Sequence, residues 1–425
     1  MVTNTKISGT PSSLRKVHRM LALKNLLFEN HSSRKSLAED LGISSMAMTR
    51  ISNDLINAGL VSENGVIKNN NIPGPNQINL IINKNSVFGV GIVLSAFKTE
   101  IGIVGANGEI VISDNIELSD ISDGKKAIQT LTKKVRDLID LKKIAYSRIL
   151  GVGISVAADL DTLKNKILGA GYLGWKPFDI KKTVEDHLSL PTFIEKIPSA
   201  LILAETSIGC AKRLNNVLLL HSSTVLGASL IINNEVVDGA YSKSGRIGHF
   251  NANKTELICS CGRNDCLNCV ASGWSILVEA GLIEDKNYKP ELVPVYAKLL
   301  NKILNKKEGF IVSNKINTLF YNAGKILALN LTKINQIIDP QLIILAGFLT
   351  NSTHYSSGIK DTLQSLGTDG NSALSKLKLG NVNIIQATCF MPLLKTIFTP
   401  NFNFEELYHS SHLVEENITN KKVIA

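Results

Sequence analysis

Residues 245–269 read Gly245-Arg-Ile-Gly-His-Phe-Asn-Ala-Asn-Lys-Thr-Glu-Leu-Ile-Cys-Ser-Cys-Gly-Arg-Asn-Asp-Cys-Leu-Asn-Cys269, and they place four of the chain's six cysteines behind one histidine. The segment offers one imidazole and three thiolates, from His249, Cys259, Cys261 and Cys266. This is the ligand set of a closed tetrahedral zinc site, and soft thiolates favour zinc over cations that prefer oxygen. Because four protein ligands leave no position for water, the sequence predicts a structural Zn²⁺ cofactor rather than a catalytic one.

The cysteine spacing leaves two alternatives open. The Cys266-x-x-Cys269 spacing makes Cys269 a competitor of His249 for the fourth ligand position. A disulfide is the other alternative, but no apolar run after basic residues marks a secretory leader, and clustered cysteines in a reducing compartment more often bind metal. We therefore expect a cytoplasmic protein in which the isolated Cys210 and Cys389 are buried small apolar residues.

Length and composition set broad limits. A chain of 425 residues should hold more than one domain, and 44% apolar residues are ample for large cores. No apolar run is long enough for a transmembrane helix, so membrane insertion is not expected. The net charge of +10 suits a phosphate-rich partner, although much of the excess is scattered lysine. Local motifs must therefore carry the functional argument.

The first eighty residues have the order of a helix-turn-helix module. The apolar spacing predicts a helix over Ser13–Glu29, and Ser33 is placed to cap a second helix over Arg34–Leu41. Gly42 makes the turn, and a third helix runs from the Ser44 cap to about Ala58. A strand from Leu60-Val61 and the Asn/Gly/Pro-rich residues 64–77 would form the wing and linker. Helix, short helix, turn and longer helix is the order of helix-turn-helix proteins.

In such a module the N-terminal end of the third helix enters the major groove of DNA. The expected DNA-binding residues are Arg34 and Lys35 on phosphates and Ser44, Ser45, Met46, Thr49 and Arg50 on bases or phosphates. Basic residues outnumber acidic ones over residues 1–80, which is the right sign for a DNA-facing module. A three-helix protein-interaction domain is the alternative. The exposed polar start of the third helix favours DNA.

Beyond Val87 apolar strands alternate with helices. Strands are expected over Val87–Leu94, Thr99–Gly105, Ile149–Val156 and Leu190–Ile194, and again over residues 216–220, 227–232 and 342–347. Alternation of strands and helices indicates an α/β architecture. Because the order restarts after the helix Ser199–Ile208, the sequence predicts two lobes with a cleft between them.

The cysteine segment is similar to the signature of the ROK family (repressors, open reading frames and sugar kinases), Gly-Glu-Ile-Gly-His followed by Cys-x-Cys-Gly-x-x-Gly-Cys-Leu-Glu. Gly42-Ile-Ser, residues 54–61, Leu173-Gly-Trp175 and residues 340–347 also resemble family segments. The resemblance implies an actin-like (ribonuclease H-like) two-lobed fold behind a winged helix, and a zinc-requiring repressor that forms a dimer or tetramer. The implied division is 1–80 for the winged helix-turn-helix and linker, 81–205 for lobe 1 with 395–425 returning to it, and 206–394 for lobe 2 with the zinc loop 245–269.

The family's kinase residues are replaced in this chain. The Asn-Asp pair that supplies the catalytic base in the family reads Lys196-Ile197, and isoleucine accepts no proton. The two glycine-rich phosphate loops read Gly91-Ile-Val-Leu-Ser95 and Val225-Leu-Gly-Ala-Ser229, and β-branched residues obstruct a close backbone approach to phosphate. The chain is therefore expected not to be an enzyme, and a sugar kinase with an appended DNA-binding domain is the disfavoured alternative.

The sugar-binding residues are altered too. The two motif glutamates read Arg246 and Asn268, so Lys196, Arg246, His249 and Asn268 are the candidate effector-cleft residues. Basic side chains in place of acids predict a cationic cleft that suits an anionic sugar derivative better than a neutral sugar. Control by a protein partner, or a cleft that binds nothing, are the alternatives. We expect a repressor of carbohydrate-related genes that binds a double-stranded DNA operator as a homodimer or tetramer.

Overall fold

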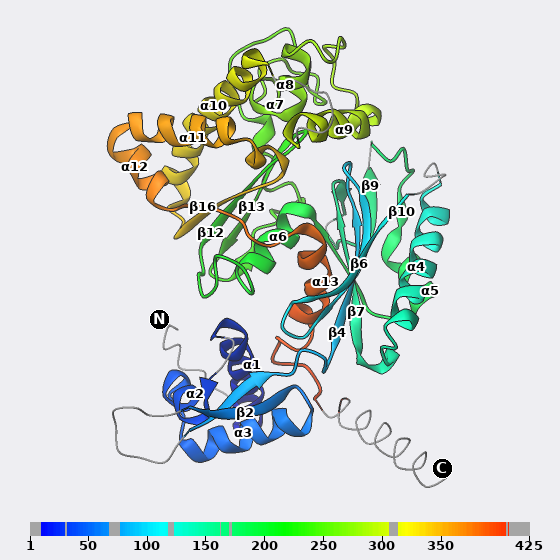
Figure 1. Cartoon of the computed structure of the whole chain (residues 1–425), viewed down its shortest axis with the longest axis vertical. Helices are drawn as coiled ribbons and strands as arrows, with labels where there is room; N and C mark the ends of the chain where they lie inside the picture. Colours follow the sequence, from blue (N-terminus) through cyan, green and yellow to red (C-terminus); the bar gives the residue numbers. More distant parts are fainter. Residues whose placement is uncertain are drawn as a thin grey trace.

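The computed structural model describes residues 10–29, 32–67, 77–117, 123–161, 163–169, 172–305, 313–404 and 407. The chain forms an N-terminal module and two α/β lobes (Figure 1). The predicted α/β fold with a helical module before two lobes is confirmed.

The N-terminal module contains three helices and a small sheet. The helices are α1 (Pro11–Glu29), α2 (Arg34–Leu41) and α3 (Ser45–Asn57), and the strands are β1 (Ser32–Ser33), β2 (Val61–Ile67) and β3 (Gln77–Ile82) in the order β1-β3-β2. Ser33 and Ser44 cap their helices as predicted, because each hydroxyl accepts a hydrogen bond from a backbone N–H three residues later. Gly42 ends α2 with φ of 63°, a left-handed conformation that favours glycine. The antiparallel strands β2 and β3 flank the predicted wing and linker, of which residues 68–76 lie outside the described ranges.

Lobe 1 is built on a five-stranded mixed sheet in the order β11-β7-β4-β5-β6. Its strands are β4 (Phe88–Leu94), β5 (Thr99–Gly105), β6 (Ile110–Ile116), β7 (Ile149–Val156) and β11 (Thr192–Lys196). Helices α4 (Gly124–Leu141) and α5 (Ile180–Leu188) lie on one face, and α13 (Ile384–Lys395) covers the other (Figure 1). A short sheet of β8 (Asp159–Leu160), β9 (Lys166–Gly169) and β10 (Phe178–Asp179) lies at the edge of this lobe.

Helix α13 packs directly on the backbone of β4 and β7. A Cβ atom at Gly89 would lie 2.1 Å from the carbonyl oxygen of Cys389, and one at Gly153 would lie 2.0 Å from that of Thr388. These glycines therefore allow the close approach of the helix. Helix α13 (Ile384–Lys395) thus packs on lobe 1, while most of the segment 395–425 that was expected to return to this lobe lies outside the described residues.

Lobe 2 contains a second mixed sheet, in the order β14-β13-β12-β15-β16. The strands are β12 (Val217–Ser222), β13 (Leu226–Ile232), β14 (Glu235–Val236), β15 (Leu342–Ala346) and β16 (Leu377–Leu379). The helices are α7 (Asn268–Ala271), α8 (Gly273–Glu279), α9 (Val293–Leu304), α10 (Asn314–Ile338), α11 (Thr353–Ser365) and α12 (Gly367–Ser375). Helix α6 (Ile197–Glu205) packs on the other side of this sheet and on α13, so it lies between the lobes.

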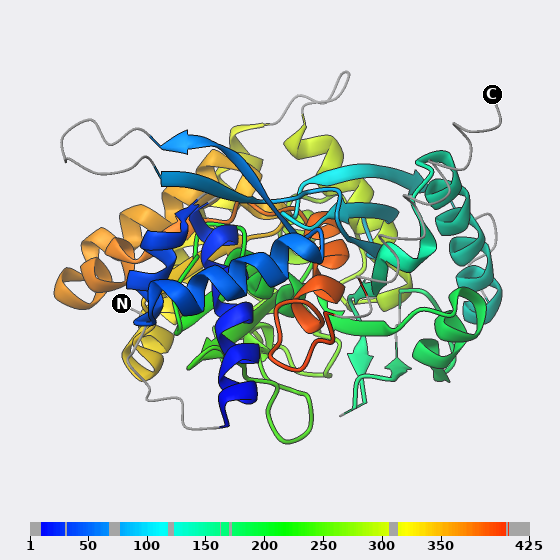
Figure 2. The same cartoon turned by 90° about the horizontal axis from the view of Figure 1, so that it is seen from below.

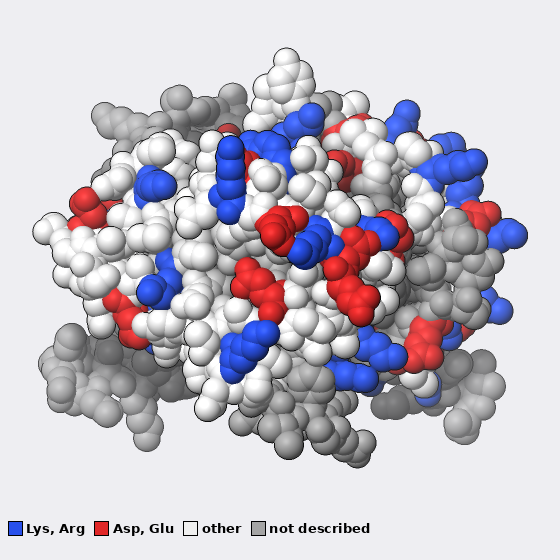
Figure 3. Space-filling model, turned by 90° about the horizontal axis from the view of Figure 1, so that it is seen from above, with Lys and Arg blue, Asp and Glu red and all other residues white. Residues whose placement is uncertain are grey.

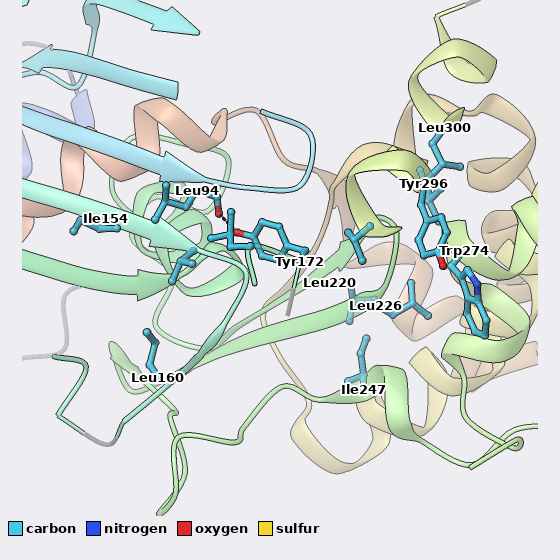
Figure 4. Packing of buried hydrophobic residues seen from close by; sticks show 14 of the residues in the cluster. Leu94, Ile154, Leu160, Tyr172, Leu220, Leu226, Ile247, Trp274, Tyr296 and Leu300 are labelled. Atoms are coloured by element: carbon cyan, nitrogen blue, oxygen red, sulfur yellow. Dashed lines mark hydrogen bonds between the residues drawn. The ribbon is translucent and has the colours of Figure 1, made fainter. Parts of the chain in front are cut away.

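One apolar core runs through both lobes. It includes Leu94 and Ile154 from lobe 1 and Leu220 and Trp274 from lobe 2 (Figure 4). The Tyr172 hydroxyl donates a hydrogen bond of 2.7 Å to the Leu94 carbonyl oxygen at the end of β4. The lobes are therefore joined by packing as well as by chain crossings.

The N-terminal module is docked below the two lobes rather than separated from them (Figures 1 and 2). Its apolar residues share a core with lobe 1 and with the chain after α13, including Leu23, Phe398 and Phe404. The Arg19 guanidinium lies 4.8 Å from the ring centre of Phe404. None of the helices in the described ranges combines the length and apolar character needed to cross a lipid bilayer.

Candidate functional site

The predicted metal ligands come together in lobe 2. One ligand atom from each of His249, Cys259, Cys261 and Cys266 lies within 4.8 Å of the others. The Cys259 Sγ atom is 3.5 Å from His249 Nδ1, and the Cys261 and Cys266 sulfurs are 3.4 Å apart. A tetrahedron with Zn–S bonds of about 2.3 Å has edges of roughly 3.8 Å. These four residues could therefore hold a metal ion without rearrangement of the fold.

Cys269 is buried next to this cluster but is not one of its four members. The pKa of the Cys259 thiol is lowered, first by a hydrogen bond from Cys269 and then by one from His249. Cys269 therefore contacts a candidate ligand, while His249 occupies the fourth position of the cluster. All six cysteines are free in the structure.

Arg263, at the tip of the cysteine loop, holds that loop in place. Its guanidinium donates hydrogen bonds to the carbonyl oxygen of His249 at 3.0 Å, to Asn251 Oδ1 at 2.8 Å and to Asp265 Oδ1 at 2.8 Å. The sequence analysis did not identify Arg263, whose position between Cys261 and Cys266 was the available signal. A cation there also offsets the charge of clustered thiolates.

The predicted recognition surface lies on α3, on the side of the N-terminal module away from the two lobes (Figure 1). The side chains of Ser44, Ser45, Met46, Thr49 and Arg50 are exposed, whereas Met48, Ile51 and Leu55 are buried against α1 and α2. The sequence spacing thus divides α3 into an apolar inner face and a polar outer face. Lys35 is exposed at the start of α2.

Arg34 differs from the expected phosphate contact. Its guanidinium donates to the Ser52 hydroxyl at 2.8 Å and to the Glu63 carboxylate at 2.7 Å, so it ties α2 to α3 and β2. A side chain held by two partners within the module is not available as a free phosphate clamp. Glu63 lies too far along the sequence for this pairing to be predicted.

On the face opposite the module, Lys and Arg side chains are interspersed with Asp and Glu (Figure 3). No field of one sign forms among the described side chains of this face. The chain's net charge of +10 is therefore not concentrated there.

The boundary between the lobes is crossed by ion pairs. Lys164 of lobe 1 lies 2.8 Å from the Glu195 carboxylate and 2.7 Å from that of Asp238 in lobe 2. The Arg246 guanidinium of lobe 2 lies 2.7 Å from Asp159 of lobe 1, and both side chains are exposed. The sequence analysis missed Asp159, Lys164 and Asp238, since no motif marked them.

The four candidate effector residues do not form one cationic cleft. Lys196 donates to the Ser242 carbonyl oxygen, and Arg246 is paired with Asp159. Asn268 is buried and accepts a hydrogen bond of 2.8 Å from the Leu226 N–H, while His249 faces the cysteines. Arg246 is balanced by the Asp159 carboxylate, whereas the Lys196 ammonium is bonded to a neutral carbonyl oxygen, so binding of an anionic ligand at these residues stays a prediction.

An aromatic pair closes another part of the interlobe boundary. The rings of Phe97, in the turn after β4, and Phe348, after β15, have centroids 4.5 Å apart. Ile197, which the sequence resemblance aligned with the family's catalytic base, is buried at the start of α6. These side chains are apolar and cannot accept or donate a proton.

The model of the ROK family matches residues 89–381. The chain is 27% identical over 348 residues to a xylose repressor of Bacillus spizizenii, covering 80% of this chain and 84% of that protein. It is 21% identical over 323 residues to the N-acetylglucosamine repressor of Escherichia coli O6:H1, covering 75% and 77%.

A solved structure with a similar fold is that of a ROK family transcriptional regulator described as a homologue of the E. coli MLC protein. The TM-score is 0.68 at 16% sequence identity, covering 93% of this chain and all of that chain. The similarity extends through the N-terminal module as well as the two lobes.

Proposed function

The chain belongs to the ROK family, and from this premise we propose that it is a DNA-binding transcriptional regulator, a repressor of carbohydrate-related genes. One observation carries the proposal: α3, capped by Ser44, presents exposed polar side chains at its N-terminal end, on the outer side of a helix-turn-helix module. Recognition helices enter the major groove with this end. The named relatives are repressors, which supports the same function for this chain. Its proposed partner is a double-stranded DNA operator, bound in the cytoplasm.

Arg50→Ala should weaken binding to DNA from the chain's own upstream region by roughly 10- to 100-fold, because one guanidinium contact to a base is worth about 1–3 kcal/mol. Lys35→Ala should weaken binding more evenly across sequences and reduce the slope of affinity against salt by about one. Mobility-shift titrations at several salt concentrations measure both. Lys133→Ala, which removes an exposed cation from α4, is the control. Equal affinity of the Arg50 variant and the parent would count against the recognition-helix assignment.

Four features support a regulator without kinase activity. Ile197, which the sequence resemblance aligns with the family's base, is buried, and the Phe97 and Phe348 rings pack together across the boundary between the lobes. Gly91-Ile-Val-Leu-Ser95 and residues 225–229 lack the glycines that cradle phosphates. Phosphoryl transfer needs both a base and phosphate contacts. Turnover of ATP with any sugar would restore the kinase alternative.

We assign His249, Cys259, Cys261 and Cys266 as the ligands of a structural Zn²⁺. The donor set is soft, the four atoms are close enough for one ion, and no coordination position is left for a substrate. Zinc would fix the loop that ends at α7, whose first residue Asn268 is bonded to the Leu226 N–H of the lobe 2 sheet. The metal would thereby set the position of the lobe 2 helices relative to the interlobe boundary.

The N-terminal module packs where the two lobes are connected. A structural change at the boundary between the lobes would therefore be transmitted to the DNA-binding surface. The buried Glu205 carboxylate accepts hydrogen bonds from the backbone N–H groups of Cys210, Asn381 and Val382. It therefore joins the two chain segments that cross between the lobes. Nearby, Arg213 pairs with Glu29 of α1 at 2.7 Å. A change at the lobe boundary would then move α1 and alter the spacing of two recognition helices in a homodimer or tetramer.

The ligand class that this boundary admits is an anionic sugar derivative at Arg246, whose pair with Asp159 is exposed and therefore weak. Asp159→Asn should free Arg246 and tighten binding of a sugar phosphate by up to about fivefold, since an exposed pair is worth up to about 1 kcal/mol. Thermal-shift titration against sugar phosphates, with neutral xylose as the comparison, measures this. Tighter xylose binding, with no effect of Asp159→Asn on sugar phosphates, would contradict the proposal. Regulation by a protein partner that binds another surface is the alternative. It predicts that neither ligand changes the unfolding temperature.

A further inference from the structure

The outer face of α3 carries a large apolar side chain where DNA-binding surfaces are usually polar. Met46, in the first turn of the helix, has 69% of its surface exposed and is the most exposed large apolar residue among those described in the N-terminal module. Met48, two residues later, is fully buried. Met46 therefore does not contribute to the core of the module, and packing does not explain an apolar side chain at this position.

Arg50 lies on the same face one helical turn later. Its Nη2 atom is 3.8 Å from the Met46 sulfur, as expected for residues four apart on a helix. The thioether and the guanidinium thus form one exposed patch. Thr49 lies beside it, but its hydroxyl already donates to the Ser45 carbonyl oxygen.

The other arginines described in the module are held by partners within the protein. Arg15 pairs with Asp54 at 2.7 Å, and Arg34 is bonded to Ser52 and Glu63. Arg19 lies over the Phe404 ring. Arg50 has no acidic or carbonyl partner recorded in the described part of the chain, so it is the guanidinium available for a base edge.

We propose that Met46 and Arg50 together read a thymine and a guanine that lie within two base-pair steps of each other in the operator half-site. In the major groove, thymine presents a C5-methyl group that suits an apolar side chain, and guanine presents the O6 and N7 acceptors that suit arginine. Residues four apart on a helix are separated by about 6 Å along its axis, and successive base pairs by about 3.4 Å, which sets this spacing. The inference rests on the proposed DNA-binding function and names the bases that function recognises.

The test uses the full-length chain and the tightest-binding duplex selected from a randomised DNA library. Each thymine of the half-site is replaced in turn by uracil, which removes only the methyl group, and each guanine by 7-deazaguanine, which removes only the N7 acceptor. One uracil position should weaken parent binding about fourfold, the value of one buried methyl group. One 7-deazaguanine position within two steps should weaken it about tenfold.

The protein variants identify the residues. Met46→Ala should bind the thymine and uracil duplexes equally, and Arg50→Ala should bind the guanine and 7-deazaguanine duplexes equally. Ile78→Ala, which truncates an exposed apolar residue on β3, is the control and should keep both sensitivities. If Met46→Ala keeps the fourfold response to uracil, the inference is overturned while DNA binding stands. If no duplex is selected at all, the proposed function itself fails and the inference with it.

Discussion

Cys259→Ala combined with Cys261→Ala should abolish zinc binding and destabilise lobe 2 by on the order of 5 kcal/mol. The expected cost is large because a structural metal contributes its binding free energy to folding, and two of its four ligands would be lost. The loop between His249 and Cys266 has little regular secondary structure and is held by backbone hydrogen bonds and by Arg263, so a bound metal would add four strong contacts to a thinly supported segment. Zinc content per chain, thermal unfolding and operator affinity would all be measured.

Three single variants make this result specific. Cys210→Ala removes a cysteine that is not a member of the cluster and should leave zinc content unchanged. Cys269→Ala should also keep one zinc per chain, whereas His249→Ala should weaken zinc binding, because the histidine is the fourth member of the cluster. A double cysteine variant that dimerised and bound its operator normally would overturn the structural role of the metal.

Lys164→Met should lower the free energy of unfolding by about 2–3 kcal/mol. Glu195 is 3% exposed, and Lys164 is the nearest cation to its carboxylate. Burial raises the pKa of Glu195, and the ammonium of Lys164 opposes that rise, so the substitution would leave a buried carboxyl group without its main partner. Urea unfolding at neutral pH measures the difference.

Two further variants separate this pair from a general effect of surface charge. Lys166→Met, on the exposed side of β9, should change stability by less than about 0.5 kcal/mol. Adding Glu195→Leu to Lys164→Met should restore much of the loss, because replacing both partners removes the unpaired buried charge. Equal destabilisation by Lys164→Met and Lys166→Met would show that the pairing with Glu195 contributes little.

Local features of the fold were predictable because their causes lie within a few residues. Ser33 and Ser44 bond to N–H groups three positions later, and Gly42 adopts the left-handed turn between them. The strands of both lobes follow from continuous apolar runs. The division of α3 into buried and exposed faces follows from helical periodicity alone.

The sequence predicted only those properties of the site that depend on one residue type at a time, such as charge. Lys196 and Arg246 are basic wherever the chain places them, but the sequence does not show that Ser242 and Asp159 lie against them. Asn268 was expected in the cleft, yet it is buried inside lobe 2, where its side-chain oxygen accepts a hydrogen bond from the Leu226 N–H. Alignment of a residue with a family motif could not show whether that residue lines the cleft or is buried inside a lobe.

The sequence by itself determined the ligand types of the metal cluster, the helix caps and the order of strands and helices, because each depends on residue chemistry and short-range geometry. Only the tertiary structure decided which charges meet. The Lys164–Asp238 and Arg246–Asp159 pairs join residues that are remote in the chain, and Arg34 is occupied by Glu63 rather than left for DNA. An ion's availability depends on its neighbours in space, and those neighbours are fixed by the packing of the two lobes and the N-terminal module.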